Sequence, residues 1–258
     1  MKNIKYTIII ILLLIQNSQV IASQNTLIIA GDYWCPYNCT PNGSNPGFLV
    51  ELIRRALHIH DIKVEYRTMS WAKSLEQIQA GKIDGIIGIS DATKYNLITT
   101  KKPLEYTTLR AFTKSDTQWV YDGPESLIGK KIGIVMDYEM GDDIGNYIGT
   151  HYIMQPSRFI VEKGRNAVIK SMTNLIDGDS DLYIEDTRVA NFCIDSANLN
   201  NYIKDAGKVS KVKLPLYIAF SPDTPNIKQY IKYFETGLTS LKNTGEYDVL
   251  RKKYKMDR

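Results

Sequence analysis

The segment that follows Ala30 brings together side chains suited to holding a small polar molecule. The apolar run LIIA ends there, and Asp32, Tyr33 and Trp34 come directly after Gly31. A carboxylate accepts hydrogen bonds or pairs with a cation, and an aromatic ring can stack on a ligand. Ligands of open α/β proteins bind at the carboxyl ends of strands. These three residues are therefore candidate ligand contacts, although the two aromatic residues could instead only pack their loop against the protein.

Two cysteines lie in the same loop, and their state depends on the compartment. Cys35 and Cys39 are separated by three residues in a stretch rich in proline and asparagine. In an oxidising compartment we expect them to form a disulfide, which leaves Cys193 as a free thiol. Two free thiols or a metal site are the alternatives. A metal would need further ligands, and the three histidines form no recognisable set, so we expect neither a metal nor a cofactor.

Cys193 is not expected to act as a nucleophile. It lies in VANFCI, where Val189, Phe192, Cys193 and Ile194 fit the buried face of one helix. The sequence also lacks the patterns G-x-S-x-G and H-E-x-x-H and the Walker phosphate loop. It therefore contains no strong catalytic constellation.

The N-terminus predicts export. Lys2 and Lys5 precede an apolar run from Ile8 to Ile15, and small or modest residues follow up to Ala22. This order is typical of a secretory signal peptide, here residues 1–22, that is removed after Ala22. The apolar run is shorter than the roughly 20 residues of a membrane-spanning helix. We expect a soluble mature protein in the periplasm.

Length and charge exclude some classes of function. The 258 residues suffice for one large or two modest domains, and 43% hydrophobic with 23% charged residues is typical of a folded protein. The net charge is +4, and two of the lysines lie in the predicted signal peptide. So weak a charge does not favour nucleic acid, and no dense Lys/Arg block favours a membrane surface.

Strands and helices alternate, which predicts an α/β protein in two similar halves. Residues 47–58 form an amphipathic helix, and a second helix has Trp71 and Ile78 on one face and ends at Gly81. IDGIIGI is apolar on both faces, as in a covered parallel sheet. The other predicted elements are the strands NTLIIAG, KVEY, KKIGIVM, DLYIED and PLYIAF, and helices over residues 168–176, after Asp186, and over about 225–242 and 245–254.

Five segments, in order, resemble extracellular solute-binding proteins of family 3, the polar-amino-acid receptors of ABC importers. They are WAKSLEQIQAGKIDGIIGI, ESLIGKKIGIV, LIDGDSDLYIED, LPLYIAFSPDTPNIKQYI and LKNTGEYDVLRKKY. Each segment alone is a weak signal, but together they cover essentially the whole mature chain.

The resemblance implies the type II periplasmic-binding-protein fold, in which two α/β lobes, each a mixed sheet flanked by helices, enclose a cleft. Lobe 1 would comprise residues 24–112 and 214–258, and lobe 2 would comprise residues 113–213. Two crossing strands would act as hinges near 110–114 and 209–215, and the lobes would close over a solute. A disulfide in the Asp32 loop, which faces the cleft, would lower the ordering cost of binding.

Carried over residue by residue, the resemblance gives a partial site. Trp71 matches an aromatic residue that stacks on the ligand, although it could instead pack with Leu75. Asp186 matches an acid that receives the ligand amino group, and it could also cap a helix that begins at Thr187. The full set of candidate ligand contacts is Asp32, Tyr33, Trp34, Trp71, Ser90, Asp91, Lys94, Asp137, Tyr138, Glu139 and Asp186.

The family's grip on a ligand α-carboxylate is not matched. Asn96 stands where the family has an arginine, and nearby Lys94 lacks the forked geometry of a guanidinium. A turn that usually offers backbone amides reads MDYEMG here, residues 136–141, and Asp91 stands where a small hydroxyl residue is common. Unless these acids are solvated loop residues, they favour a cationic or polyhydroxylated solute, or an amino acid held by other groups.

The sequence therefore predicts a monomeric receptor, not an enzyme. It would capture a small polar solute, an amino acid or a similar and even cationic molecule, and deliver it to an ABC permease in the inner membrane. The alternative is a periplasmic dehydratase of the cyclohexadienyl or arogenate type on the same fold, with Glu139 and Asp186 as first candidates for the proton donor. A sensor module is disfavoured because no spanning helix or output domain follows Arg258.

Overall fold

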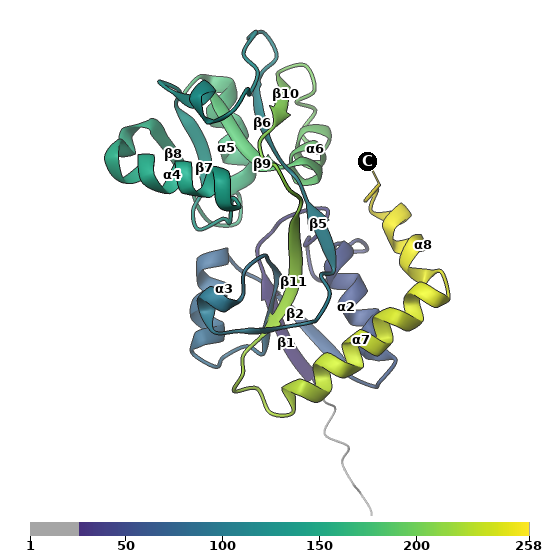
Figure 1. The fold of residues 1–258 in the computed structure, drawn as a ribbon. Coiled ribbons are helices and arrows are strands. Elements are labelled where there is room, and N and C mark those ends of the chain that lie inside the picture. Colours follow the sequence, from purple (N-terminus) through teal and green to yellow (C-terminus); the bar gives the residue numbers. More distant parts are fainter. Residues whose placement is uncertain (1–25, 258) are drawn as a thin grey trace, which may run out of the picture.

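Two mixed sheets organise residues 26–257, the part of the chain that the computed structural model describes (Figure 1). The predicted signal peptide, residues 1–22, lies outside the described residues. Each sheet is the centre of one lobe, and the strands β5 and β11 run between the lobes. No helix among residues 26–257 combines the length and the apolar character needed to cross a membrane.

The sheet of the first lobe has the order β2-β1-β3-β11-β4, and β5 pairs with β11. The strands β1, β2 and β3 are parallel, whereas β11 is antiparallel to all of its neighbours. A late segment of the chain therefore lies inside a sheet built mainly from the first hundred residues. The strands are β1 (Thr26–Gly31), β2 (Lys63–Thr68), β3 (Gly85–Ile89), β4 (Ile98–Thr99), β5 (Glu105–Thr107) and β11 (Leu214–Phe220).

The sheet of the second lobe has the order β10-β6-β9-β7-β8 and repeats this design. The strands β7, β8 and β9 are parallel, and β6 is antiparallel to β9 and β10. The strands are β6 (Leu109–Lys114), β7 (Ile132–Val135), β8 (Phe159–Glu162), β9 (Leu182–Asp186) and β10 (Ile203–Lys208).

Helices cover both faces of each sheet because the strands are apolar on both sides. Along β1, Leu27 and Ile29 pack in the same core as α2, whereas Ala30 packs with Trp71 of α3 on the opposite face. The helices of the first lobe are α2 (Phe48–His58), α3 (Trp71–Gln79), α7 (Ile227–Asn243) and α8 (Glu246–Lys253). Those of the second lobe are α4 (Asp142–Met154), α5 (Ala167–Asp177) and α6 (Thr187–Ser196).

The predicted amphipathic helix 47–58 is confirmed as α2. Its predicted apolar face is buried and consists of Leu49, Leu52, Ile53, Ala56 and Leu57. It packs closely against α7. A Cβ atom at Gly237 of α7 would lie 2.0 Å from the carbonyl oxygen of Ala56. Only glycine therefore permits this approach of the two helices.

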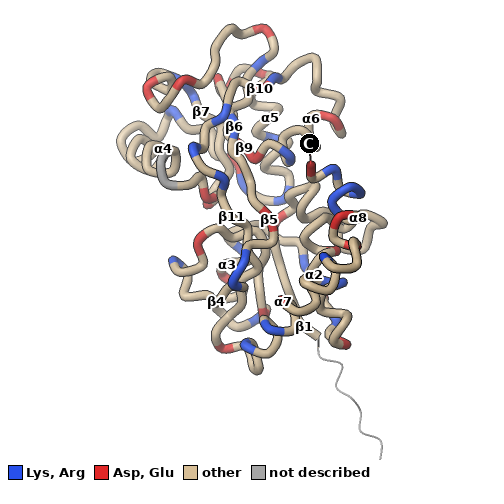
Figure 2. The backbone as a smooth tube through the Cα atoms, turned by 45° about the vertical axis from the view of Figure 1, so that its right-hand side comes forward, with Lys and Arg blue, Asp and Glu red and all other residues tan. Residues whose placement is uncertain are grey.

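Sheet membership changes between β5 and β6 and again between β10 and β11. Residues 109–112, which the predicted boundary gives to lobe 1, pair in the second sheet, so the first crossing lies near Thr108. The two crossing segments touch each other, since the Val209 N–H donates to the Leu109 carbonyl at 2.9 Å. Figure 2 shows blue and red charged positions intermixed along both lobes.

One predicted packing position is wrong. Val189 and Ile194 of α6 are buried and Cys193 is half-buried, but the Phe192 side chain is 40% exposed. At 100° per residue, Phe192 lies well outside the arc that Val189, Cys193 and Ile194 define, so it faces solvent.

Candidate functional site

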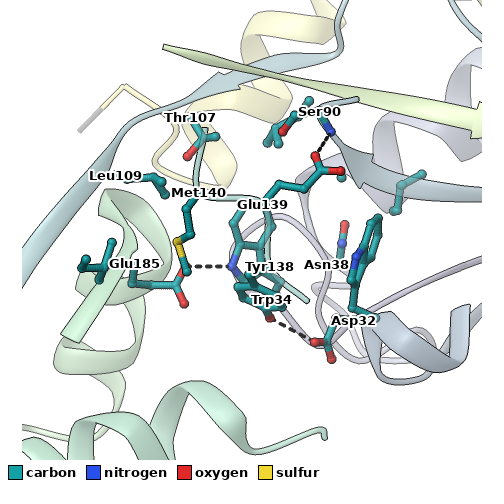
Figure 3. A pocket seen from close by; sticks show the side chains of 15 residues that line it. Asp32, Trp34, Asn38, Ser90, Thr107, Leu109, Tyr138, Glu139, Met140 and Glu185 are labelled. Carbon is teal, nitrogen blue, oxygen red and sulfur yellow. Dashed lines mark hydrogen bonds between the residues drawn. The ribbon is translucent and has the colours of Figure 1, made fainter. Parts of the chain in front are cut away.

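A pocket lies between the two lobes, beside the crossing strands (Figure 3). Its polar and aromatic lining residues come from loops that follow β1, β3 and β7, from the start of α3, from the end of β5 and from the end of β9. The first lobe contributes Asp32, Trp34, Asn38, Trp71 and Ser90, and the second contributes Tyr138, Glu139 and Glu185.

Aromatic rings form much of the wall. Trp34 stacks on Tyr37 with ring centroids 4.6 Å apart, and Tyr138 meets it edge-on at 6.3 Å. Trp71 begins α3 directly after the N-cap Ser70, and the residue is only 7% exposed. Apolar rings around a polar pocket suit a solute that has both a hydrocarbon body and a charged group.

Asp32 is a buried acid, and the described residues that line the pocket offer it no counter-ion. Its carboxylate accepts hydrogen bonds from the Tyr138 hydroxyl at 3.0 Å and from the Tyr33 N–H at 2.7 Å. Burial raises the pKa of Asp32 to about 6, and these hydrogen bonds offset only part of the increase. The pKa of Tyr138 is raised as well, by burial and by the charge of Asp32.

Glu185 is the second acid of this kind. It accepts a hydrogen bond from the Trp34 indole N–H at 3.1 Å, and its other partners are the Tyr183 hydroxyl and the Asp186 N–H. Burial raises the pKa of Glu185 to about 7. At neutral pH this carboxyl group is therefore divided between its neutral and charged forms.

Glu139 reaches across the cleft to the end of β3. Its Oε2 atom accepts hydrogen bonds from the N–H groups of Ser90 at 2.8 Å and Asp91 at 3.2 Å. Its Oε1 atom is buried and has no hydrogen-bond partner in the described part of the chain. Figure 3 shows the carboxylate pointing at Ser90.

Two further polar atoms of the pocket have no partner within residues 26–257. They are Oδ1 of Asn38, whose residue is 2% exposed, and Nε1 of Trp71. Buried polar groups in folded proteins are normally hydrogen-bonded. The unpaired acceptors and this indole donor therefore leave unused hydrogen-bonding capacity in the pocket wall.

Charge in the pocket is of one sign. The described lining residues include Asp32, Glu139 and Glu185 but neither lysine nor arginine. Among residues 26–257 no group of His, Cys, Asp and Glu side chains is arranged to hold a metal ion. The arrangement suits an organic cation, whose N–H groups can donate to the acids while its carbon atoms contact the rings.

The other predicted contacts lie elsewhere. Asp91, Lys94 and Asp137 line an adjoining cavity that shares Ser90, Tyr138 and Glu139 with the pocket. The Tyr33 ring lies outside the pocket lining, and the Arg165 guanidinium lies 5.4 Å from its centroid.

Asp186 is fully buried and does not belong to the pocket lining. Its carboxylate caps α6 through the N–H groups of Arg188 and Val189 at 2.8 and 2.9 Å. It also accepts hydrogen bonds from the hydroxyl groups of Tyr37 and Thr107. The capping role is therefore observed, and the neighbouring Glu185 is the acid that reaches the pocket.

Arg188 links the two lobes through hydrogen bonds. The Arg188 guanidinium, on α6 of the second lobe, donates to the Tyr37 hydroxyl at 2.9 Å and to the Met256 carbonyl at 2.8 Å. Both partners belong to the first lobe. Arg188, Asn38 and Glu185 are not among the residues predicted from the sequence. Only Glu185 had a signal there, its position next to the predicted contact Asp186.

The predicted disulfide between Cys35 and Cys39 is present, and Cys193 is a free, half-buried thiol. The disulfide closes a turn in which Trp34 and Asn38 form a backbone bridge. It therefore holds two pocket residues, Trp34 and Asn38, at the ends of one short loop.

Comparisons with known proteins agree with this architecture. The sequence model of the bacterial extracellular solute-binding proteins, family 3, matches residues 27–257. No curated protein sequence matches the chain significantly.

Solved structures share the fold at low identity. A histidine kinase sensor domain with similarity to periplasmic binding proteins aligns with a TM-score of 0.74 and 20% identity, over 90% of this chain and 96% of that domain. A mutant of ArgBP from T. maritima aligns with a TM-score of 0.72 and 19% identity, over 91% of this chain and 96% of that protein. The arginine-, lysine-, histidine-binding protein ArtJ from Geobacillus stearothermophilus aligns with a TM-score of 0.71 and 18% identity, over 89% of this chain and 95% of that protein. The predicted type II two-lobed fold is confirmed, and the chain belongs to the bacterial extracellular solute-binding proteins, family 3.

Proposed function

We propose that this protein is a periplasmic receptor that binds a small, positively charged organic solute between its lobes and delivers it to an ABC importer. The observation that carries the proposal is the pocket itself. Asp32, Glu139 and Glu185 line it together with aromatic rings, and its described lining offers no basic side chain. A bound cation would supply the missing counter-charge.

Closure of the lobes would be the binding step. Three hydrogen bonds already join opposite walls of the pocket, from Trp34 to Glu185, from Tyr138 to Asp32 and from the Ser90 N–H to Glu139. A solute that binds both walls would strengthen this arrangement relative to an open one. ArtJ, which is named for binding arginine, lysine and histidine, has the same fold and takes ligands with basic side chains, which supports a cationic solute here.

The experiment is a ligand screen of the purified mature protein. We would measure the unfolding temperature with amines, guanidines, amino acids and sugars, and we expect cations to raise it most. Calorimetry should then give one ligand per chain, mass spectrometry should recover it unchanged, and small-angle scattering should show a more compact particle. A ligand at 100 times its Kd stabilises a protein by about 2.7 kcal/mol. Preference for neutral sugars would contradict the proposal.

One observation favours a second function, a dehydratase. The raised pKa of Glu185, about 7, leaves a protonated acid available to donate to a leaving hydroxyl group at neutral pH. Incubation with cyclohexadienyl substrates tests this: an aromatic product that absorbs in the ultraviolet, lost on Glu185→Gln, would replace the receptor proposal.

A further inference from the structure

The N–H groups at the end of β3 form an anion site that the protein itself fills. Ser90 and Asp91 both donate to one oxygen of Glu139, at 2.8 and 3.2 Å. Neighbouring backbone N–H groups that converge on one point make a binding site for an anionic oxygen. Because Glu139 comes from the opposite lobe, its carboxylate crosses the cleft to reach this site (Figure 3).

The other oxygen of the Glu139 carboxylate lacks a hydrogen-bond donor among the described residues. Its Oε1 atom is buried without a partner in the described structure, and so is Oδ1 of Asn38, which lines the same pocket. A buried acceptor that lacks a hydrogen bond destabilises the folded protein. Ligand N–H groups would satisfy both atoms, whereas a ligand carboxylate would satisfy neither.

A solute carboxylate has no evident place in this pocket. It would add a negative charge to a site that contains Asp32, Glu139 and Glu185 and no basic residue among the described lining. Like charges in one desolvated site repel. To use the N–H groups of Ser90 and Asp91, the solute would have to displace Glu139 and leave that acid beside it.

We propose that Glu139 replaces the carboxylate of the ligand, so that the cognate solute is a small organic amine or guanidine that has no carboxylate. This inference rests on the proposed receptor function and adds a ligand class to it. Glu139 then has two effects: Oε2 occupies the anion position, and Oε1 receives an N–H group of the cation.

Pairs of compounds that differ only by the carboxylate test the proposal. We would measure Kd by calorimetry for agmatine against arginine, cadaverine against lysine, and phenethylamine against phenylalanine. The wild-type protein should prefer one or more of the amines over its parent amino acid by at least about tenfold. Glu139→Ala should weaken binding of the amine at least about tenfold and strengthen binding of the amino acid, because the N–H groups become free.

Two variants serve as controls. Glu139→Gln keeps an oxygen for the N–H groups but loses the charge, so it should weaken amine binding without admitting the amino acid. Glu125→Ala removes an exposed acid of the second lobe that is not part of the pocket lining, and it should bind as the wild type does.

The outcomes distinguish the role of Glu139 from the receptor function on which it rests. Equal affinity for an amino acid and its amine, unchanged in Glu139→Ala, would overturn the role of Glu139 and leave the receptor function intact. Binding of no compound by the wild type or by Glu139→Ala would overturn the receptor for cations and this inference with it.

Discussion

The indole N–H of Trp34 and the carboxylate of Glu185 are joined across the cleft by a hydrogen bond of 3.1 Å. Trp34 belongs to the disulfide loop of the first lobe, and Glu185 lies near the end of β9 in the second. The bond therefore links the ionisation of a buried acid to the contact between the lobes.

Stability should fall as the pH rises from about 4 to 7. The folded pKa values of Asp32 and Glu185, about 6 and about 7, exceed the ordinary values of these side chains, 3.8 and 4.5. In this window the folded protein holds protons that the unfolded chain has released, so the free energy of unfolding decreases with pH. Urea unfolding at pH 5 and pH 8 measures the effect.

Glu185→Gln should reduce this pH dependence and raise stability at pH 8 relative to the wild type. The raised pKa of Glu185 corresponds to a change of at most about 3 kcal/mol in the free energy of unfolding across this pH range. Glu125→Gln, a change of an exposed acid, is the matched control. A wild-type protein as stable at pH 8 as at pH 5 would contradict the burial of uncompensated acids.

Cation binding should release protons at neutral pH. A positive charge in the pocket stabilises the ionised forms of Asp32 and Glu185. It therefore lowers the pKa values of both carboxyl groups, which release protons. Affinity should therefore rise between pH 5 and pH 8. Calorimetry at pH 6.5 in buffers of different ionisation enthalpy counts the protons, and net uptake would exclude this direction of linkage.

Trp71→Ala should weaken solute binding by roughly 30-fold, about 2 kcal/mol, because a ring of the pocket wall is lost. Trp71 also packs with Ile78 and Ile86, so some loss of stability is expected as well. Trp71→Phe keeps a ring and should retain most of the affinity. Trp119→Ala changes a half-buried residue that packs against the core of the second lobe, and it controls for stability alone. Unchanged affinity in a folded Trp71→Ala protein would remove this residue from the site.

Thiol titration of the unfolded, unreduced mature protein should count one thiol. Cys35 and Cys39 are bonded to each other, and Cys193 is free. Burial raises the pKa of Cys193 to about 11, so the folded protein should react more slowly than the unfolded one. A count of three thiols would mean that the disulfide is absent.

Local patterns made the fold predictable. Apolar spacing identified α2, α3 and α5, and the strands β1, β3, β7 and β9 follow from short, largely apolar runs in the sequence. The short strands β4 and β5 carry little periodicity, and they form because β11 offers them a partner far along the chain. Such pairing depends on tertiary contacts that a local pattern does not contain.

The site was predictable in its residue types more than in its contacts. Trp34, Trp71 and Glu139 were expected and do line the pocket. The choice between Glu185 and Asp186 depends on which of two adjacent side chains faces the cleft, because side chains alternate along a strand. The contact from Glu139 to Ser90 joins two lobes, and no spacing along the chain encodes it.

The position of β11 in the first sheet has a consequence for the order of assembly. Everything that the second sheet needs lies between residues 109 and 208, so this sheet can complete itself while the rest of the chain is still being synthesised or translocated. The first sheet must wait for residues 214–220, which pair with β3, β4 and β5. The lobe whose strands come first in the chain is thus finished after the second, and the pocket forms only once residues 214–220 are available.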